Sequence, residues 1–514
     1  MLDRRNFVKT FLAGGASLLV LKELNAAQPL AGFNVAGKLG QADDPWAQIP
    51  QILTRINPPA FPNRDFVVTK FGARGDGKFD CTDAFRKTIE ACNRAGGGRV
   101  VIPAGQFSTG AIHLKSNVNL HVSKDATIRF DRDPKKYLPV VFTRWEGMEL
   151  MNYSPFIYAF EEKNIAITGD GVIDGNADCT HWWPWKGRVK CGWKEGDPEQ
   201  SKARELLYDY VAKGTPIAER VFGEGSYLRP QFIQPYRCQN VLIEGVTLRH
   251  SPMWQLHPVL CTNVTVRNVN IEREEKANDQ TGPNCDGCDP ESCKDVLIEG
   301  CTFATGDDCI AIKAGRNNDG RRVAVPSENI IIRNCRMKDG HGGITIGSEI
   351  SAGVRNVFAY NCHLDSPNLN IAIRFKNNAL RGGLLENFFF RDIEVGQVSD
   401  ATITIDFNYE EAYNGPFTPV VRNVVVSGLK SSKSFRALDL QGLTKAPIYN
   451  VRLENCTFDN VAKNNIVKNV QGLEFRNVRV NGKLIAEPAR VGSAVINVID
   501  GTSARYRSSL GIDG

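Results

Sequence analysis

Asn240-Val241-Leu242-Ile243-Glu244-Gly245-Val246-Thr247-Leu248 is the clearest copy of a nine-residue pattern that recurs along the second half of this 514-residue chain. Each copy has Asn or a substitute, alternating apolar positions, and then Asn or Gly followed by Val or Cys. Further copies begin at Asn263, Asp295, Asn329, Asn356, Asn387, Asn423 and Asn450, with a degenerate copy at Gly472 and an early one at Asn164. The alternation is typical of β-strands, and Asn and Gly are typical of the turns between them.

Successive copies begin roughly 22 to 36 residues apart. This period fits one coil of a parallel β-helix, with the longer intervals forming loops on one side. We therefore predict an all-β fold: a single-stranded, right-handed parallel β-helix, or solenoid. An amphipathic helix capped by Thr82 or Asp83 and ended by Gly96-Gly97-Gly98 is expected to cover its amino end, because an open end would expose apolar core and strand edges.

The first 27 residues have the features of an export signal. Arg4 and Arg5 precede an apolar run from Phe11 to Leu21, which is too short for a convincing membrane-spanning helix. The segment resembles a twin-arginine signal, which is removed after export. We expect the mature protein in the periplasm or outside the cell, without a stable membrane partner. Retention of the segment as an uncleaved anchor is the alternative.

The rest of the chain divides by pattern. Residues 28–63 are predicted to be a linker, residues 64–482 the β-helix, and residues 483–514 a tail. Residues from about 180 to 229 are too many and too polar for one coil. They are predicted to be an insertion that walls off one end of a cleft.

The net charge is +6, and the signal segment contributes +2 of it (four cations minus two acids), which leaves about +4. A slight cationic excess is compatible with a polyanionic substrate. The charge is diffuse, and no basic stripe is interleaved with aromatic residues, so a nucleic-acid partner is not expected.

Four short motifs carry the chemistry: Asn284-Cys285-Asp286, Gly306-Asp307-Asp308, Gly340-His341-Gly342-Gly343 and Arg374-Phe375-Lys376. Coils of a β-helix stack at about 4.8 Å, so equal offsets in different copies are vertical neighbours. Asp307 and His341 each lie 12 residues after the start of their copy (307 − 295 and 341 − 329), so they should be one rung apart. Asp286 belongs to the coil before, and Arg374 and Lys376 to the coil after.

Alternation predicts which way these side chains face. In the motif Arg374-Phe375-Lys376 the cations alternate with apolar residues, so Arg374 and Lys376 should face solvent together. Strict alternation would send Asp308 inward with Ile310 and Ile312. Because burying an unpaired carboxylate is costly, we expect the strand to begin after Asp308.

The four motifs resemble the signature of the polygalacturonases, glycoside hydrolase family 28, which reads roughly Asn-Thr-Asp, Gly-Asp-Asp, Gly-His-Gly and Arg-Ile-Lys. Cys285 replaces Thr, Phe375 replaces Ile, and a basic insertion, Arg316 to Arg322, precedes the third motif. The resemblance extends from about Phe66 to about Val480. The segment from Ser251 to Pro258, which contains His257, is similar to bacterial members.

The resemblance implies a role for each charged residue. Asp307 would be the general acid, kept protonated by its charged neighbours, and Asp286 and Asp308 would activate the attacking water. His341 would orient the acid, and Arg374 and Lys376 would bind the carboxylate of a uronate. We expect inversion of configuration, for which acid and base usually stand roughly 6.5 to 9.5 Å apart.

The function implied is hydrolysis of α-1,4-galacturonosidic bonds of pectin or oligogalacturonides, by exo attack in analogy with bacterial relatives. A rhamnogalacturonan-type galacturonohydrolase, a pectate lyase and a non-catalytic sugar-binding β-helix are the alternatives. No metal or cofactor is expected. His257 is a candidate for substrate binding, and residues 182–185 (Trp-Trp-Pro-Trp) either stack on sugars or pack a loop.

The cysteines are predicted to be mainly structural. Cys301, Cys335, Cys362 and Cys456 occupy the same position of their copies and should form a buried ladder. The group at 285, 288 and 293 could suggest a zinc site, but it lacks a paired Cys-x-x-Cys partner at conventional spacing. A disulfide between Cys179 and Cys191 is one pairing that the sequence allows.

Overall fold

The computed structural model describes residues 44–187, 191–272, 282–410 and 415–485. The predicted signal segment, residues 1–27, lies outside the described residues, as does most of the predicted tail. No helix within the described ranges combines the length and apolar character needed to cross a membrane.

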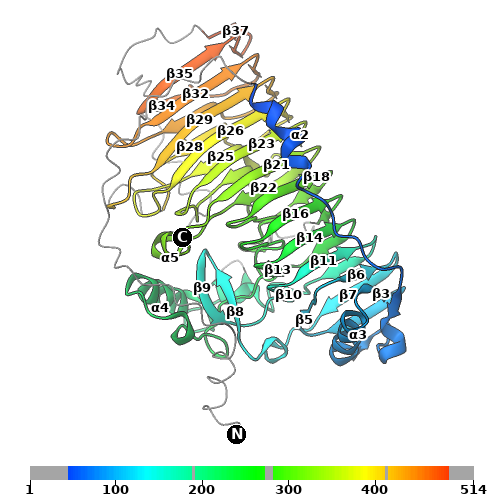
Figure 1. The fold of residues 1–514 in the computed structure, drawn as a ribbon. Helices are drawn as coiled ribbons and strands as arrows, with labels where there is room; N and C mark the ends of the chain where they lie inside the picture. The colour runs from blue at the N-terminus through cyan, green and yellow to red at the C-terminus, as the bar shows by residue number, and fades with distance from the viewer. Residues whose placement is uncertain (1–43, 188–190, 273–281, 411–414, 486–514) are drawn as a thin grey trace, which may run out of the picture. The chain divides into compact units, whose positions relative to one another are not determined.

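The chain winds into a right-handed parallel β-helix, which confirms the predicted fold (Figure 1). Its longest sheet has 13 parallel strands, one from almost every coil. They are β1 (Asp65–Val67), β3 (Gly98–Ile102), β6 (Val118–Val122), β11 (Lys163–Thr168), β14 (Gln239–Glu244), β16 (Thr262–Arg267), β18 (Lys294–Glu299), β21 (Ser327–Arg333), β23 (Val354–Tyr360), β26 (Leu384–Arg391), β29 (Val420–Ser427), β32 (Ile448–Glu454) and β35 (Val470–Arg476).

A second face follows the turn after each of these strands. It contains β2 (Asp76–Asp80), β4 (Gly105–Thr109), β7 (Ala126–Phe130), β12 (Val172–Asp174), β15 (Thr247–Arg249), β17 (Asn270–Ile271), β19 (Thr302–Ala304), β22 (Arg336–Ile346), β24 (His363–Leu364), β27 (Glu394–Val395), β30 (Lys430–Ser431), β33 (Thr457–Phe458) and β36 (Arg479–Val480), with β37 (Lys483–Leu484) antiparallel to the last.

The third face carries the site. It begins with β5 (Ile112–His113), β10 (Ile157–Phe160) and β13 (Ile233–Tyr236), and later contains β20 (Ile310–Ile312), the second half of β22, β25 (Leu369–Lys376), β28 (Ala401–Asp406), β31 (Arg436–Gln441) and β34 (Ile466–Lys468). Between the two groups only isolated bridges continue the pairing, from Ile233 through Leu256 and Cys288 to Ile310. Regular strand pairing is therefore interrupted in the coils just before the site.

The recurring Asn has a structural cause. Residues such as Asn240, Asn329 and Asn356 have φ near +60°, a left-handed conformation that Asn tolerates better than most residues. The side-chain amides also form a ladder along the solenoid: Asn356 Nδ2 donates to Asn329 Oδ1 (3.2 Å), and Asn387 Nδ2 to Asn356 Oδ1 (3.1 Å). In a coil that begins with such an Asn, one residue therefore both makes the turn and bonds to the neighbouring coil.

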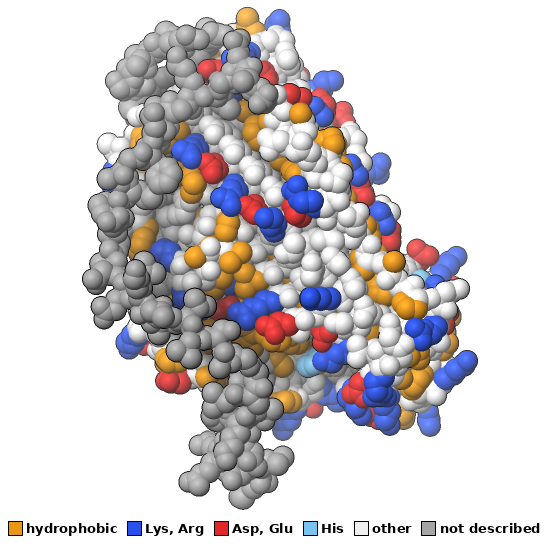
Figure 2. Space-filling view, in the orientation of Figure 1, with side chains coloured by type: hydrophobic (Ala, Val, Ile, Leu, Met, Phe, Trp, Pro, Cys, Tyr) orange, Lys and Arg blue, Asp and Glu red, His pale blue; other side chains and the backbone are white. Residues whose placement is uncertain are grey.

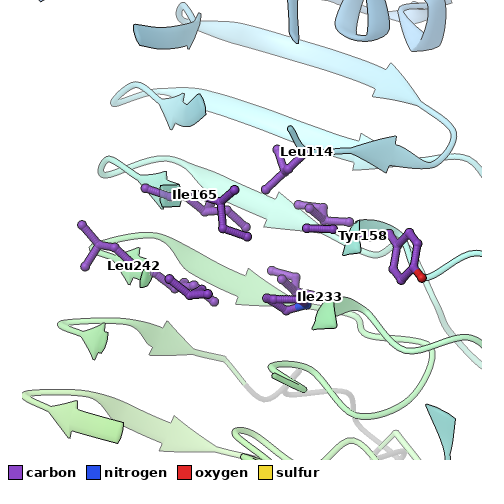
Figure 3. Close-up of a pocket in the computed structure, with 12 residues that line it drawn as sticks. Leu114, Tyr158, Ile165, Ile233 and Leu242 are labelled. Carbon is purple, nitrogen blue, oxygen red and sulfur yellow. The ribbon is translucent and has the colours of Figure 1, made fainter. Parts of the chain in front are cut away.

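The interior of the coils is apolar. Register pairs such as Ile165 with Val241, and Val241 with Val264, stack equivalent buried side chains along the axis. Figure 3 shows residues lining a small gap in this core, including Leu114, Ile165 and Ile233 from different coils. The gap measures about 10 Å³, so the core is closely packed.

Helix α3 (Thr82–Arg94) covers the first coil, as predicted, with Phe85, Ile89 and Cys92 buried. The predicted N-cap is wrong: Cys81 occupies that position and makes no side-chain cap bond. Asp80 instead accepts hydrogen bonds from the backbone N and the hydroxyl of Thr82.

Part of the predicted linker is helical. Within it, η1 (Pro45–Gln48) and α2 (Ile49–Leu53) lie along the 13-stranded sheet. Trp46 makes edge contacts with the rings of Phe358, Tyr360 and Phe389 (centroid distances 5.8 to 6.5 Å). Arg55 forms two hydrogen bonds to Asp295 of the sheet, at 2.8 and 3.0 Å.

The insertion predicted between about 180 and 229 contains η4 (Trp183–Lys186), α4 (Ser201–Ala212) and η6 (Ile217–Glu219). The hairpin of β8 (Val141–Trp145) and β9 (Met148–Asn152) packs with it, as does α5 (Asn317–Val323), which contains most of the basic insertion. Two further 3-10 helices, η2 (Val68–Phe71) and η3 (Pro134–Tyr137), lie nearer the amino end. Trp182 and Trp183 are buried in the core, so these two rings pack rather than stack on a ligand.

The cysteine ladder is confirmed for Cys301, Cys335 and Cys362, whose buried thiols interact with one another along the axis. A second ladder, of Cys238, Cys261 and Cys293, was not predicted. Cys179 and Cys191 form a disulfide.

Candidate active site

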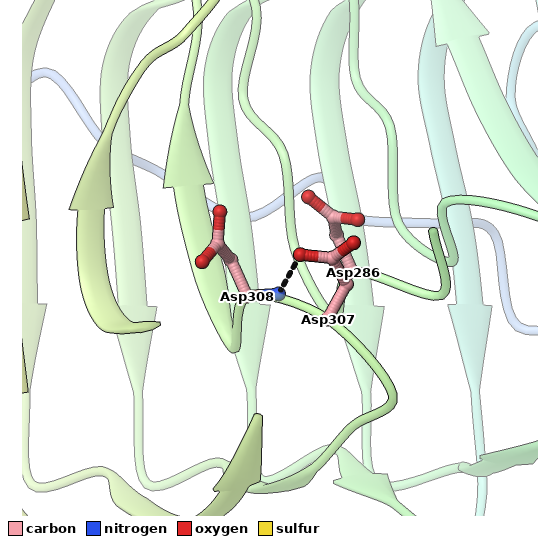
Figure 4. Close-up of side chains that lie close together, drawn as sticks. All are labelled: Asp286, Asp307 and Asp308. Atoms are coloured by element: carbon pink, nitrogen blue, oxygen red, sulfur yellow. Dashed lines mark hydrogen bonds between the residues drawn. The ribbon is translucent and has the colours of Figure 1, made fainter. Parts of the chain in front are cut away.

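The residues of the four motifs converge on the third face of the solenoid. One carboxylate oxygen from each of Asp286, Asp307 and Asp308 lies within 4.8 Å of the others. Figure 4 shows the carboxyl groups of Asp286 and Asp307 side by side, and the backbone N–H of Asp308 donating to Asp307 Oδ1 at 3.0 Å. The predicted clustering of three carboxylates is therefore present.

His341 lies directly next to Asp307, one coil further on. The backbone N–H of His341 donates to the carbonyl of Asp307 (3.1 Å), and its Nδ1 lies 3.0 Å from Asp307 Oδ1. The equal-offset argument thus placed these two side chains correctly. Their side chains are also the exposed ones: 47% for His341 and 17% for Asp307, against 4% for Asp286 and 0% for Asp308. A molecule approaching the site from solvent meets His341 and Asp307 first.

Two glycines make the close approach of these coils feasible. Gly340 has φ +137°, and a Cβ there would lie 2.3 Å from the carbonyl oxygen of Asp307. A Cβ on Gly342 would lie 2.7 Å from Asp308 Oδ1. Side chains at either position would push His341 away from the carboxylates.

Arg374 and Lys376 reach the cluster from β25. Lys376 Nζ donates to Asp308 Oδ2 at 2.6 Å, and Arg374 Nη1 is 3.5 Å from Asp308 Oδ1. The two side chains are only 7% and 12% exposed, so the expectation that both face solvent is wrong for Lys376. Strand β20 begins at Ile310, after Asp308, as predicted, and Asp308 tolerates burial because it is paired.

Tyr409 borders this cation pair. Lys376 Nζ lies 5.3 Å and the guanidinium of Arg374 5.7 Å from the centre of its ring. Burial raises the pKa of the Tyr409 hydroxyl, so it stays neutral and can serve as a hydrogen-bond donor beside the cations.

A second set of charges below the carboxylates was not foreseen. Lys313 Nζ lies 3.1 Å from Glu349, 3.6 Å from Asp286 and 3.8 Å from Asp289. The register offered a signal: Ile312 pairs with Ile346, which pairs with Phe375, so Lys313 follows an apolar residue just as Lys376 does. The ammonium groups of Lys313 and Lys376 thus place positive charge beside the carboxylate cluster.

His257 does not belong to the surface of the site. Its side chain is fully buried, its Nε2 lies 2.7 Å from Glu291, and its Nδ1 lies 2.9 Å from the amide of Gln234. The prediction that His257 binds substrate is therefore wrong. His257 therefore lies between a hydrogen-bonded carboxylate, an amide and the ring of Trp254, which are the surroundings of a structural histidine.

The environments push the pKa values of the carboxyl groups apart. Burial, together with the charges of Asp289 and Asp307, raises the pKa of Asp286 well above its usual range. Burial also raises the pKa of Asp307, but His341, Lys376 and Arg374 outweigh it and hold that pKa below its usual value. The charge of Asp307 in turn raises the pKa of His341. Before substrate binds, the proton therefore favours Asp286, contrary to the expectation that Asp307 is kept protonated.

The separation of the carboxylates also differs from the expected one. Their nearest oxygens are within 4.8 Å, which is shorter than the usual spacing of roughly 6.5 to 9.5 Å in inverting glycosidases. Asp286 and Asp308 are buried, whereas Asp307 is partly exposed.

Comparison with known proteins points to one family. A family model described as "Glycosyl hydrolases family 28" matches residues 223–480, which is half of the chain. The exo-poly-alpha-D-galacturonosidase of Dickeya chrysanthemi is 26% identical over 477 residues, covering 81% of this chain and 74% of its own.

Solved structures agree. The hyperthermoactive exopolygalacturonase from Thermotoga maritima is 45% identical, with a TM-score of 0.82 over 88% of this chain and 98% of that one. The polygalacturonase of Erwinia carotovora ssp. carotovora, at 22% identity, shares the fold with a TM-score of 0.59 over 82% of this chain and 98% of its own.

Proposed function

We propose that this chain, which belongs to glycosyl hydrolases family 28, hydrolyses the α-1,4-galacturonosidic bonds of pectin or oligogalacturonides from the chain end. The observation that carries the proposal is the contact between Asp307 and His341 at the exposed floor of a site that also contains Arg374. This reaction needs an acid, a group that orients the acid and a cation that binds a uronate.

In the proposed mechanism Asp307 protonates the departing glycosidic oxygen. His341 holds the carboxyl group of Asp307 through Nδ1 and so fixes its direction. Asp308, kept in place by Lys376, and Asp286 hold the attacking water, and one of these two carboxylates accepts the single proton that the water loses as it adds to the sugar. Arg374 pairs with the carboxylate of the bound uronate.

In this mechanism, substrate binding causes Asp307 to become protonated. The cations Arg374, Lys376 and His341 lower the pKa of Asp307 in the free enzyme. A uronate carboxylate that pairs with Arg374 offsets part of that positive charge, so the pKa of Asp307 rises. The proton then transfers from the cluster to Asp307 only when there is a bond to cleave.

The experiment is digestion of polygalacturonate, with products sized over time. Galacturonate monomer present from the first time point supports exo hydrolysis, whereas a ladder of intermediate lengths indicates endo attack. Asp307→Asn should lower kcat by about 10²- to 10⁴-fold while binding persists. An unsaturated product, or activity that a chelator abolishes, would instead indicate a lyase.

Inversion is the proposed stereochemical course. Asp286 and Asp308 are buried beneath Asp307, which favours attack by water over attack by a carboxylate. Proton NMR of the first product distinguishes the outcomes: a β-anomer formed from the α-linkage supports inversion, and an α-anomer indicates retention.

Export by the twin-arginine route to the periplasm or the medium is also proposed. The disulfide between Cys179 and Cys191 supports it, because such bonds persist in oxidising compartments. Replacing Arg4 and Arg5 together by Lys should leave the protein in the cytoplasm. Cell fractionation measures this, and unchanged export contradicts the assignment.

A further inference from the structure

The insertion brings one cation to the site that no motif predicted. Lys186 ends helix η4 and is half-buried. Asp307 and Glu146 are among the charged groups close enough to act on its ammonium, together with Arg229 and Arg204. This electrostatic coupling, together with the contacts that hold η4 beside Asn284, places Lys186 in the wall of the carboxylate site.

Two chains of contacts fix η4 to the motif that contains Asp286. In the first, the backbone N–H of Gln200 donates to the carbonyl of Trp185 (2.7 Å), and the Gln200 side chain accepts from Arg229 Nε (3.1 Å). Arg229 in turn donates to Asn284 Oδ1 at 2.7 Å and to the carbonyl of Pro283 at 2.6 Å.

In the second chain, Trp183 Nε1 donates to the carbonyl of Ser251 (2.9 Å), which also accepts from the thiol of Cys285 (3.3 Å). Both chains end within two residues of Asp286. The position of Lys186 relative to the reacting carboxylates is thus set by buried contacts.

Lys186 differs from the other cations of this wall in having no partner. Arg204 Nε is 2.8 Å from Glu146, Arg229 is bound to backbone carbonyls, and Arg316 lies 3.4 Å from Glu349. Within the part of the chain that the structure describes, Lys186 makes no hydrogen bond or ion pair. Burial is the main cause that lowers the pKa of its ammonium, the signature of a cation that has lost water without gaining an equivalent anion.

The anchor of Lys186 and the position of Arg374 lie on opposite sides of the acid. Trp183 of η4 bonds to Ser251, in the coil before that of Asp286, whereas Arg374 lies two coils beyond Asp307. Two sugars joined across Asp307 would place one carboxylate toward each cation.

We propose that Lys186 binds the carboxylate of the chain-terminal galacturonate, across the scissile bond from Arg374, and thereby selects a terminal uronate for cleavage. The inference rests on the proposed function and adds the residue that recognises the terminal sugar. Lys186 is a specificity-determining residue and takes no part in proton transfer.

The test compares trigalacturonate with the same trimer carrying a methyl ester on its non-reducing terminal sugar. Hydrolysis of trigalacturonate by the wild-type enzyme comes first, and failure there overturns the proposed function itself. The wild-type enzyme should then prefer the acid over the ester by about tenfold in kcat/KM, which corresponds to about 1.4 kcal/mol.

Lys186→Met should raise KM for the acid by about tenfold, leave kcat within about twofold, and abolish the preference over the ester. Lys186→Arg should retain most of the preference. Lys202→Met is the matched control, since Lys202 is an exposed lysine of the same insertion, and it should behave as wild type.

A preference that survives in Lys186→Met overturns the proposal, as does a fall in kcat with unchanged KM. If Lys186→Met does not fold, the wild-type enzyme alone decides, because equal kcat/KM for acid and ester would exclude a cation that reads the terminal carboxylate.

Discussion

The contact between Asp307 and His341 could be predicted from the sequence, but the pKa of Asp307 could not. Their pairing followed from counting 12 residues from two repeat starts, and the structure places Nδ1 and Oδ1 3.0 Å apart. The direction of the Asp307 pKa did not follow, because it depends on the distances to Arg374 and Lys376 and on the burial of each group. Offsets in a repeat predict neighbours, whereas proton affinities need three-dimensional charge geometry.

Protonation of Asp307 on substrate binding leads to a prediction about the pH dependence of activity. A general acid works only when protonated, so activity falls as pH rises through its pKa. This alkaline limb of the pH profile reports the pKa of the free enzyme when kcat/KM is plotted, and the pKa of the enzyme–substrate complex when kcat is plotted. Because a bound uronate offsets the charge of Arg374, the alkaline limb of kcat should lie at higher pH than that of kcat/KM.

The control is Arg374→Gln, which removes one of the cations that lower the pKa of Asp307. In this variant the alkaline limb of kcat/KM should move to higher pH and approach that of kcat. Coincident limbs in the wild-type enzyme would contradict protonation of Asp307 on substrate binding.

Asp289 carries a second prediction at this scale. It is fully buried, neither of its carboxylate oxygens has a hydrogen-bond partner, and burial raises its pKa well above the usual range. A carboxyl group with a raised pKa in the folded state costs stability as pH rises from its unfolded pKa, about 3.9, through the folded value. Asp289→Asn should therefore raise the melting temperature at pH 7 and have little effect near pH 4.

Calorimetry at the two pH values measures this difference. Asp125→Asn serves as the comparison, because Asp125 is exposed in a turn with φ +62° that Asn also tolerates. A lower melting temperature for Asp289→Asn at pH 7 would mean that its attraction to Lys313, 3.8 Å away, outweighs the cost of burial.

At the scale of elements, the Asn ladder is broken between Asn263 and Asp295. Asp295 replaces Asn in its copy, and its carboxylate side chain has no N–H to donate, so Asn263 Oδ1 is buried without a partner. Asp295 instead accepts two hydrogen bonds from Arg55, and Asn263 donates to the carbonyl of Asn57. The carboxylate at this position thus anchors the amino-terminal segment, residues 44–57, to the sheet.

Asp295→Asn should complete the ladder and release that segment. Arg55 is 45% exposed, so the pair contributes about 1 kcal/mol or less. Losing about 1 kcal/mol increases the opened fraction about fivefold, and trypsin should cleave after Arg55 about fivefold faster. Mass spectrometry of the fragments over time measures the rate.

Asp65→Asn removes the exposed pair with Arg99 and should leave cleavage at Arg55 unchanged. Equal cleavage rates in the Asp295→Asn variant and the wild type would show that Trp46, and not Arg55, holds the segment.

The strands and the ladder of Cys301, Cys335 and Cys362 could be predicted because successive coils repeat the same pattern of apolar and turn residues. The amino-terminal segment was not, since residues 45–53 become helical by packing on a sheet that is far away in sequence. His257 was misplaced for a related reason. The motif from Ser251 to Pro258 does not reveal that His257 is buried, and the contact with the buried Glu291 from the next coil identifies this histidine as structural.

At the scale of the whole molecule, charges of both signs are mixed. On the face shown in Figure 2, Lys and Arg side chains alternate with Asp and Glu and form no continuous basic surface. With a net charge of +6 over 514 residues, long-range attraction of a polyanion is weak. Recognition of a uronate must therefore come from the local cations Arg374, Lys376 and Lys186.

This distribution predicts a specific response to salt. Screening acts over about 10 Å at 0.1 M ionic strength, so added salt weakens the attraction between exposed cations of the site and a polyanion. Raising NaCl from about 0.02 to about 0.3 M should increase KM for trigalacturonate severalfold and leave kcat nearly unchanged, because the reacting carboxylates are buried. Initial-rate measurements with a fully methyl-esterified trimer provide the control, whose KM should be insensitive to salt. A fall in kcat with constant KM would place the screened interaction in the transition state and contradict recognition by these cations in the bound substrate.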